Sequence, residues 1–211
     1  MALFPNVEAF LLVGGKSSRM GRDKALLEIN GAPLVQRAAD LLAPLVSKIT
    51  LVTSATVPAE PTDTNRYSNF GLPTLTDRWP NAGPLGGIAT ALAAAQSPWC
   101  LILACDMPFI TNEWLTYLLD QPTQSQSTAD VIIPETERGL EPLCAVYSSA
   151  CAPTLAVALE NGVRKVTDAL AHLKQMRIGE NQWRTFSSDG NLFGNLNTWQ
   201  DYLEAQQRLK C

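Results

Sequence analysis

The chain has 211 residues, 46% of them hydrophobic and 17% charged, which is ordinary for one α/β domain with a sizeable core. Its formal net charge of −4 argues against the broad basic surface that non-specific nucleic-acid binding requires. Five cysteines without a CxxC pair favour neither a disulfide framework nor a zinc site, so we expect a reducing, cytoplasmic setting.

The first apolar run, residues 9–13, predicts a buried strand, and it is too short to cross a membrane. The residues before it lack the basic start of a signal peptide, so no membrane association is expected. Gly14 and Gly15 follow, and their backbone N–H groups could approach an anion because no Cβ stands in the way. Four cations and one acid come next: Lys16, Arg19, Arg22, Lys24 and Asp23. The pattern indicates a polyphosphate site, with a tight surface turn as the plainer alternative.

Two common nucleotide motifs are excluded by spacing. A P-loop needs a glycine where Phe10 stands, and the spacing of Gly14, Gly15 and Gly21 does not give the GxGxxG of a dinucleotide site.

The next stretch reads as a helix and two strands. Pro33 can occupy a first helical turn, and leucine, valine and alanine at helical spacing over 34–45 predict a helix with one face in the core. Residues 49–53 are rich in β-branched side chains and predict a strand. Prolines and asparagines over 54–70 indicate an irregular excursion with room for one helical turn, and 72–75 a short strand.

A second glycine-rich loop is expected at 81–87, where Gly83 and Pro84 precede two further glycines. It leads into an alanine-rich helix over 87–96. The continuous apolar run 99–104 predicts a buried strand.

The following segment predicts a helix and two more strands. Thr111 is a good N-cap for a helix over 112–119, and the Gln/Ser/Thr-rich residues 121–129 indicate a loop. Strands are expected at 131–133 and 143–147, after a turn around Gly139.

The last part of the chain predicts helices over 153–160, 164–173 and 198–209, with an edge strand at 183–186. Strands therefore alternate with helices, which implies a mainly parallel sheet with helices on both faces. No repeat or linker divides the chain, so we expect a single domain over 1–211.

Three features fall at the carboxyl ends of predicted strands: the loop 14–24, the turn 77–87 and Asp106. Ligands of such sheets bind outside these ends, where the strand order reverses. A carboxylate at that place either caps the next helix or binds a hard cation. Because magnesium takes one or two carboxylates plus phosphate oxygens, we favour a metal role for Asp106 beside a phosphate loop.

Nucleotidyl transfer needs in-line positioning and neutralised phosphate charge rather than covalent help from the protein. Lys24 would lie near the α-phosphate and Arg19 nearer the leaving group, the alternative for each being a solvated surface cation. Arg22 is expected at the surface.

The stretch AFLLVGGKSSRMGRDK resembles the LAGGxSxRMGxDK signature of nucleotidyltransferases, with Val13 where alanine is usual. More narrowly, it is similar to the molybdenum cofactor guanylyltransferase family. LACDMP around Asp106 and GPLGG agree with that family, as does FxNxNT, here Phe193, Asn195, Asn197 and Thr198. The resemblance covers about residues 9–205. It implies a Rossmann-like sheet of the nucleotide-diphospho-sugar transferase type.

The resemblance also implies ligands and site residues. GTP would be bound at Leu12, Val13, Gly14, Lys24 and Asp77, with Mg²⁺ on Asp106. The acceptor, molybdopterin or the molybdenum cofactor, would lie beside Asn195 and Asn197, although Asn195 and Thr198 could instead cap the last helix. Glu141 could line the acceptor half of the cleft. Molybdoenzymes and other cofactor-assembly proteins are the implied partners.

We therefore read the chain as a magnesium-dependent guanylyltransferase that joins GMP to molybdopterin and releases pyrophosphate. Gly15 and the Gly83-Pro84-Leu85-Gly86 turn favour guanine, because glycines leave room for a purine and expose backbone groups to its edge. The alternatives are use of CTP, a sugar 1-phosphate acceptor, or a non-catalytic nucleotide- or cofactor-binding module.

Overall fold

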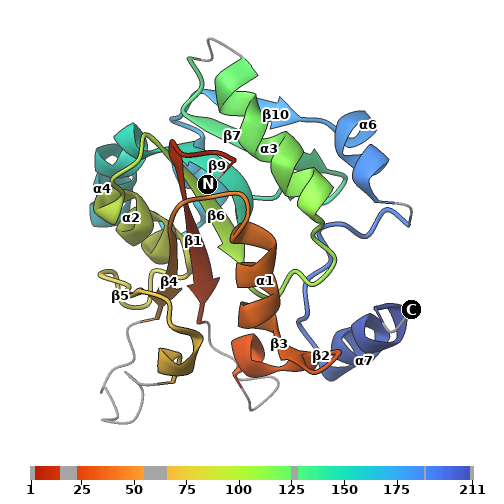
Figure 1. Cartoon of the computed structure of the whole chain (residues 1–211). Coiled ribbons are helices and arrows are strands. Elements are labelled where there is room, and N and C mark those ends of the chain that lie inside the picture. Colours follow the sequence, from red (N-terminus) through yellow and green to blue (C-terminus); the bar gives the residue numbers. More distant parts are fainter. Residues whose placement is uncertain (1–2, 15–22, 55–65, 125–127, 188, 210–211) are drawn as a thin grey trace.

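The computed structural model describes residues 3–14, 23–54, 66–124, 128–187 and 189–209, and a twisted sheet runs through its centre (Figure 1). The strands lie in the order β10-β7-β9-β6-β1-β4-β5, with β8 paired to β7. All neighbours along this order are parallel except β9, which is antiparallel to β6 and β7, so the prediction of a mainly parallel sheet is confirmed. The strands are β1 (Val7–Val13), β4 (Ile49–Thr53), β5 (Thr74–Thr76), β6 (Trp99–Ala104), β7 (Val131–Thr136), β8 (Gly139–Leu140), β9 (Cys144–Ser148) and β10 (Gln175–Ile178), with β2 (Glu28–Ile29) and β3 (Ala32–Pro33) forming a separate hairpin.

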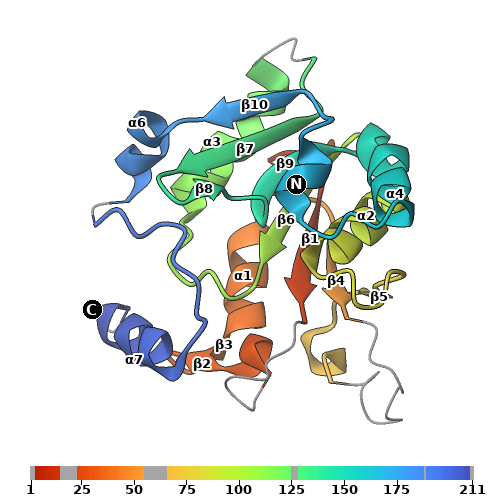
Figure 2. The ribbon, with the colours of Figure 1, turned by 180° about the vertical axis from the view of Figure 1, so that it is seen from behind.

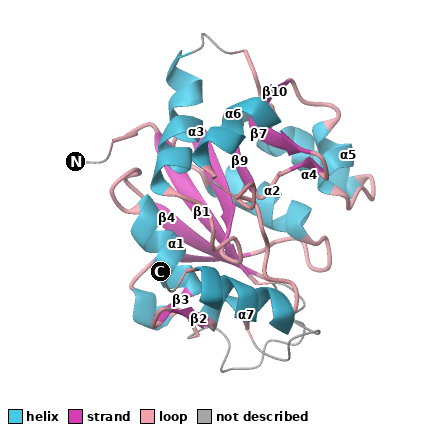
Figure 3. Cartoon of the chain, turned by 90° about the vertical axis from the view of Figure 1, so that its right-hand side faces the viewer, coloured by secondary structure: helices cyan, strands magenta, loops and turns pink. Residues whose placement is uncertain are grey.

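Helices cover both faces of the sheet, as expected (Figures 1 and 2). One face carries α1 (Leu34–Leu42) and α3 (Asn112–Gln124); the other carries α2 (Pro84–Ala94), α4 (Ala152–Glu160) and α5 (Val166–Leu170). Figure 3 shows the sheet edge-on between these layers, with α7 beside the β2–β3 hairpin. The remaining helical pieces are α6 (Glu180–Trp183), α7 (Trp199–Arg208) and the 3-10 turns η1 (Lys24–Leu26), η3 (Ser68–Phe70), η4 (Ser149–Cys151) and η5 (Arg184–Phe186).

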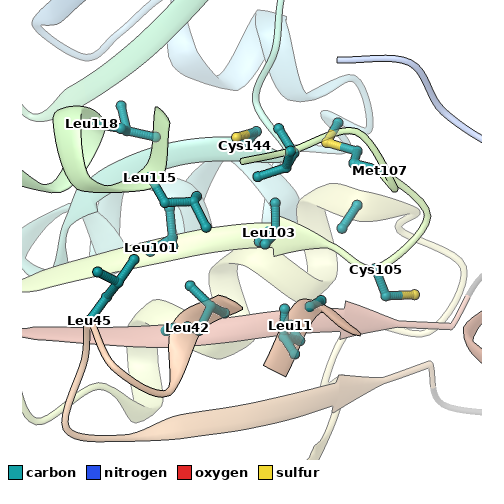
Figure 4. Packing of buried hydrophobic residues seen from close by; sticks show 14 of the residues in the cluster. Leu11, Leu42, Leu45, Leu101, Leu103, Cys105, Met107, Leu115, Leu118 and Cys144 are labelled. Carbon is teal, nitrogen blue, oxygen red and sulfur yellow. The ribbon is translucent and has the colours of Figure 1, made fainter. Parts of the chain in front are cut away.

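The central strands are apolar throughout because each is buried on both faces. In β1, Leu11 points into the core beneath α1 and α3, whereas its neighbour Phe10 packs on the opposite face. In β6, Leu101 and Leu103 join the first core and Ile102 the second. Figure 4 shows side chains of β1 and β6 meeting those of α1 and α3. This alternation, with a period of two residues, fixes the register of the strands.

The connections reverse direction next to β1. The chain runs from β1 to β4 and β5 toward one edge, then returns to place β6 on the other side of β1. The carboxyl ends of β1 and β6 therefore flank the switch point of the sheet, which is where such folds bind ligands.

Several predicted elements agree with the structure in their bounds. The strands expected at 49–53 and 99–104 are β4 and β6, and Thr111 caps α3 by accepting the Trp114 N–H at 3.2 Å. The single turn expected within 54–70 is η3.

Other predictions were wrong in an instructive way. Residues 183–186 are the end of α6 and η5 rather than an edge strand, consistent with the helical three-residue spacing of Trp183 and Phe186. The edge strand is instead β10, whose short sequence QMRI has only one buried side chain, Ile178, and so gave no apolar pattern. Helix α3 continues to residue 124, into the expected loop, because Gln121 is buried and donates to the Tyr117 carbonyl at 3.0 Å.

Two boundaries also moved at proline and glycine positions. Pro33 lies in β3 and precedes α1 with an extended ψ of 147° instead of starting the helix. The expected loop 81–87 is half helical, since α2 begins at Pro84. Proline is tolerated in the first turn of a helix because a backbone N–H at that position would have no partner within the helix. Gly86 is therefore in the first turns of α2. A Cβ there would lie 2.8 Å from Asp77 Oδ2 and 3.0 Å from the Trp79 Cβ.

This packing gives a matched pair of stability predictions in α2. Gly86→Ala should lower the free energy of unfolding by about 1–3 kcal/mol, because the added methyl overlaps the Asp77 carboxylate. Gly87→Ala is the control: its nearest neighbour would be Leu12 Cδ2 at 3.4 Å, and alanine improves helix propensity by up to about 1 kcal/mol. Urea titrations compare the two variants. Equal stability would contradict the close approach of α2 to Asp77.

Candidate active site

The strand register brings the predicted site residues to one edge of the sheet. Val13 pairs with Thr53, Thr53 pairs with Thr76, and Leu12 pairs with Ala104. The residues just beyond these ends are Gly14, Ser54, Asp77 and Asp106. The convergence expected from the sequence is therefore confirmed for the described parts of all three segments.

Gly14 is a glycine for steric reasons. Its φ is +147°, and a Cβ would lie 2.8 Å from the Ser54 N and 2.9 Å from its Oγ. The backbone turns out of β1 here at close quarters with the end of β4, which only glycine permits. The two residues before it differ: Val13 is fully buried and can offer a ligand only backbone groups, whereas Leu12 is partly exposed.

Three side chains from distant parts of the chain meet beyond β6. Lys24 Nζ lies 3.3 Å from Asp106 Oδ2 and donates to Asn197 Oδ1 at 3.1 Å. The Lys24 and Asp106 side chains are each 22% exposed, so the ion pair borders solvent and can be reached. The Asp106 carbonyl accepts the Leu196 N–H at 3.0 Å, which fixes the segment before α7 against the end of β6. Charge of both signs is thus concentrated at the switch point.

Asp23, which the sequence analysis counted only as a charge, has a structural role next to Lys24. Its Oδ1 accepts the Ala25 N–H at 3.0 Å and so caps η1, the turn that begins at Lys24. Its Oδ2 accepts from the Tyr67 hydroxyl at 2.6 Å and from Arg66 at 3.0 Å. Tyr67 was missed because it lies in the stretch that reads as irregular.

Asp77 holds the turn before α2. Its Oδ1 accepts the Trp79 N–H at 2.9 Å and the Thr90 hydroxyl at 3.0 Å, and Thr90 in turn accepts the Arg78 N–H. Burial raises the pKa of the Asp77 carboxyl, and these two hydrogen bonds act in the opposite direction. Thr90 was missed, although a polar side chain in an alanine-rich helix was a signal for a buried hydrogen bond.

The predicted acceptor residues lie in different environments. Asn197 contacts Lys24, and Asn195 has a buried Oδ1 without a hydrogen-bond partner among the described residues. Thr198 is a cap: its hydroxyl accepts the Asp201 N–H at 3.1 Å, and its own N–H donates to Asp201 Oδ2 at 2.8 Å. Glu141 follows β8 and accepts from the Thr136 hydroxyl at 3.3 Å, and burial raises its pKa.

Four predicted cationic or glycine positions fall outside the described residues: Gly15, Lys16, Arg19 and Arg22. Within the described ranges, no group of three or more His, Cys, Asp or Glu side chains could hold a metal ion. A single carboxylate at Asp106 suits a hard cation whose other ligands are phosphate and water oxygens.

One cavity lies next to the segment that carries Asp106. A cavity of about 570 Å³ lies between α1, the segment after β6 and the end of α7, and its walls include Cys105 and Met107 but neither Lys24 nor Asp106.

Among the described helices, none is long and apolar enough to span a bilayer.

Comparison with known proteins gives consistent matches. Residues 9–175 match the MobA-like NTP transferase domain family. The chain is 32% identical over 196 residues to the "Probable molybdenum cofactor guanylyltransferase" of Pelotomaculum thermopropionicum, covering 93% of this chain and 90% of that protein. It is 34% identical over 173 residues to the protein of the same name from Trichormus variabilis, covering 79% and 78%. The crystal structure of molybdopterin-guanine dinucleotide biosynthesis protein A from Archaeoglobus fulgidus is similar with a TM-score of 0.79 and 26% identity, covering 95% and 97%.

The raised pKa of Glu141 generates a pH-dependent stability prediction. Because burial raises the pKa of the Glu141 carboxyl above its ordinary value, the ionised carboxylate destabilises the fold at neutral pH, and this penalty disappears as the pH falls through the raised pKa. Glu141→Gln should therefore raise the denaturation midpoint at pH 7 and lose that advantage near pH 4. The control is Glu160→Gln, at the exposed end of α4. A Gln variant less stable than the unmodified protein at pH 7 would contradict the assignment.

Proposed function

This chain belongs to the MobA-like NTP transferase domain family, and we propose that it transfers GMP from GTP to the phosphate of molybdopterin. Pyrophosphate leaves, and the product is the guanine dinucleotide form of the molybdenum cofactor. The observation that carries the proposal is the meeting of Lys24, Asp106 and Asn197 at the switch point of the sheet. The identity of the acceptor and of the nucleotide is inferred from the names of the relatives. The arrangement of the side chains by itself indicates only a site for phosphate groups.

The chemistry is a substitution at phosphorus. A phosphate oxygen of the acceptor forms a bond to the α-phosphorus of GTP, and the bond to the bridging oxygen of the β-phosphate breaks. Negative charge grows on the α-phosphate and the leaving group, so the protein's task is positioning and electrostatic stabilisation. We assign the α-phosphate to Lys24, whose ammonium lies beyond β6 and borders solvent. Arg19 remains assigned to the leaving pyrophosphate.

Asp106 is the residue that would hold magnesium. Its carboxylate is partly exposed, and among the described side chains only Lys24 donates to it. One hard carboxylate at a phosphate site fits the ion's preference for oxygen ligands with several waters retained. Bound there, Mg²⁺ would neutralise charge on the triphosphate.

The nucleotide would lie along the ends of β1 and β5. Leu12, Val13 and Gly14 are assigned to it through backbone groups, which suits the burial of Val13. Gly83 has φ +64° and nothing within 4 Å of an added Cβ, so it offers the open backbone expected near the base. Gly86 and Gly87 do not contribute such room, because they are packed inside the fold. Asp77 supports this wall by holding the turn before α2.

The acceptor would lie on the other side of Lys24. Asn197 accepts a hydrogen bond directly from the lysine. Asn195 has a buried Oδ1 without a hydrogen-bond partner among the described residues, and burial raises the pKa of Glu141, so both carry a polar group that a ligand could satisfy. Hand-over of the product to molybdoenzymes, with the help of other cofactor-assembly proteins in the cytoplasm, completes the proposal.

Rival functions differ in a single assay. Use of CTP or a sugar 1-phosphate would give pyrophosphate with another substrate pair, whereas a non-catalytic binding module would give none. Pyrophosphate release with molybdenum-loaded molybdopterin and each of the four nucleoside triphosphates separates all of them.

The metal assignment predicts the effect of one atom change. Asp106→Asn keeps the shape of the side chain but loses the charge, and turnover should fall by about 100-fold or more while the melting temperature stays near that of the unmodified protein. Asp168→Asn, at an exposed position of α5, is the matched control and should keep full activity. Near-normal turnover in a folded Asp106→Asn protein would return this residue to a structural role.

The base assignment predicts a nucleotide preference. GTP should exceed CTP by more than about 10-fold in kcat/KM, since polar groups left unpaired by the wrong base cost roughly 1–3 kcal/mol each. Gly15→Ala should narrow the preference, chiefly by reducing activity with GTP. Parallel kinetics with both triphosphates provide the measurement, and equal or better use of CTP by the unmodified protein would refute guanine selection.

A further inference from the structure

Next to Lys24 in the sequence, Asp23 is the centre of a hydrogen-bond network with Ala25, Tyr67 and Arg66, none of which is assigned to the nucleotide or the acceptor. Asp23 adopts an extended conformation with φ −66° and ψ 115°, and caps η1 by accepting the Ala25 N–H at 3.0 Å. The second carboxylate oxygen accepts from the Tyr67 hydroxyl at 2.6 Å and pairs with Arg66 at 3.0 Å. Both oxygens of Asp23 are thus engaged, one by η1 and the other by Arg66 and Tyr67, which directly precede η3.

The tyrosine end of this network is buried. Tyr67 is only 6% exposed and belongs to the core between the sheet and α1, with its ring 6.4 Å from that of Phe70. Burial, reinforced by the hydrogen bond and negative charge of Asp23, raises the pKa of the phenol well above its ordinary value. The hydroxyl therefore stays protonated at working pH and donates a short, charge-assisted hydrogen bond to Asp23.

We infer that Tyr67 is a positioning residue for the transfer reaction: by fixing Asp23, it sets the place of the Lys24 ammonium opposite Asp106. Two physical effects follow from the contacts. The hydroxyl orients the Asp23 carboxylate that caps η1, and this cap fixes the backbone conformation of Lys24, the first residue of that turn. It also occupies Asp23 Oδ2, together with Arg66, so this neighbouring carboxylate is not available to draw the lysine away from Asp106.

The geometry has a consequence for kinetics, and this part of the inference rests on the proposed function. Misplacing a group that stabilises the transition state by about 1 Å can cost up to about 100-fold in rate, whereas ground-state affinity depends on many other contacts. Loss of the Tyr67 hydroxyl should therefore reduce kcat more than it changes KM for GTP. A residue with a purely structural role would instead lower the melting temperature and leave the turnover of the folded protein intact.

The test begins with Tyr67→Phe, which removes the hydroxyl and keeps the buried ring. We expect kcat to fall about 10-fold with KM for GTP changed less than about 2-fold. Tyr117→Phe is the control, because that hydroxyl lies on α3 and accepts a hydrogen bond from Gln182 rather than donating to Asp23. Unchanged kcat for Tyr67→Phe, or equal loss in both variants, would overturn the inference.

A double-mutant cycle then asks whether Tyr67 acts through Lys24. In a Lys24→Ala background the further change Tyr67→Phe should lower the residual turnover by less than about 2-fold, since the group being positioned is gone. Effects that multiply in full would show that Tyr67 acts by another route.

An activity-independent measurement separates this inference from the proposed function. Lysines dimethylated with ¹³C-formaldehyde give one NMR resonance each, and the Lys24 signal is assigned as the one absent in Lys24→Arg. We expect this resonance to shift toward that of free lysine in Tyr67→Phe and to stay in place in Tyr117→Phe. An unmoved signal in Tyr67→Phe would overturn the positioning role. Absence of pyrophosphate release by the unmodified protein, with the shift observed, would overturn the proposed reaction alone.

Discussion

The parallel pairing of β1 with β6 and β4 is the constraint on which the rest of the structure depends. It makes these strands end at the same edge, so residues as far apart in sequence as Gly14, Asp77 and Asp106 are brought to one edge of the sheet. The register is fixed because alternate residues of β1 and β6 fill two separate cores. A slip of the register by one residue would turn each side chain toward the core on the opposite face of the sheet, where it does not fit. The site would be lost together with the packing. The geometry of the site is therefore a product of hydrophobic burial.

This dependence explains which features were predictable. Long apolar or β-branched runs bounded by polar turns gave β4 and β6 to the residue, and a carboxylate directly after such a run pointed to Asp106. Weak patterns failed: β10 has one buried side chain, and the 183–186 segment had to be classified from two aromatic residues. The start of α2 at Pro84 is not predictable from the sequence because a cluster of glycines is typical of a loop, whereas Gly86 is required by the close approach of Asp77. Tertiary contact decided those cases, and a single sequence does not display it.

The polar residues of the site show the same limit more sharply. Asp106 and Lys24 were identifiable from their positions and charge, but Tyr67 and Thr90 have functions defined entirely by their partners, which lie 44 and 13 residues away. A buried hydrogen-bonded tyrosine and a core tyrosine look identical in sequence. What distinguishes Tyr67 is that its hydroxyl meets a carboxylate that is already capping a turn, and leaving that carboxylate unsatisfied would be costly.

The ion pair at the centre of the site has a further meaning under the proposed assignment. Lys24 is held by Asp106 and Asn197, the side chains assigned to the metal and to the acceptor. In the free protein these contacts balance charge that would otherwise border solvent unpaired. Ligands bound to Asp106 and Asn197 would compete for these contacts, and the ammonium would then pair with the nearest remaining negative charge, the phosphate of the nucleotide. Because Asp23 is already satisfied by Tyr67 and Arg66, it offers no competing place for that charge. The contact between the Lys24 ammonium and the phosphate would thus be strongest only when metal, nucleotide and acceptor are all bound. An interaction of this kind raises kcat rather than ground-state affinity.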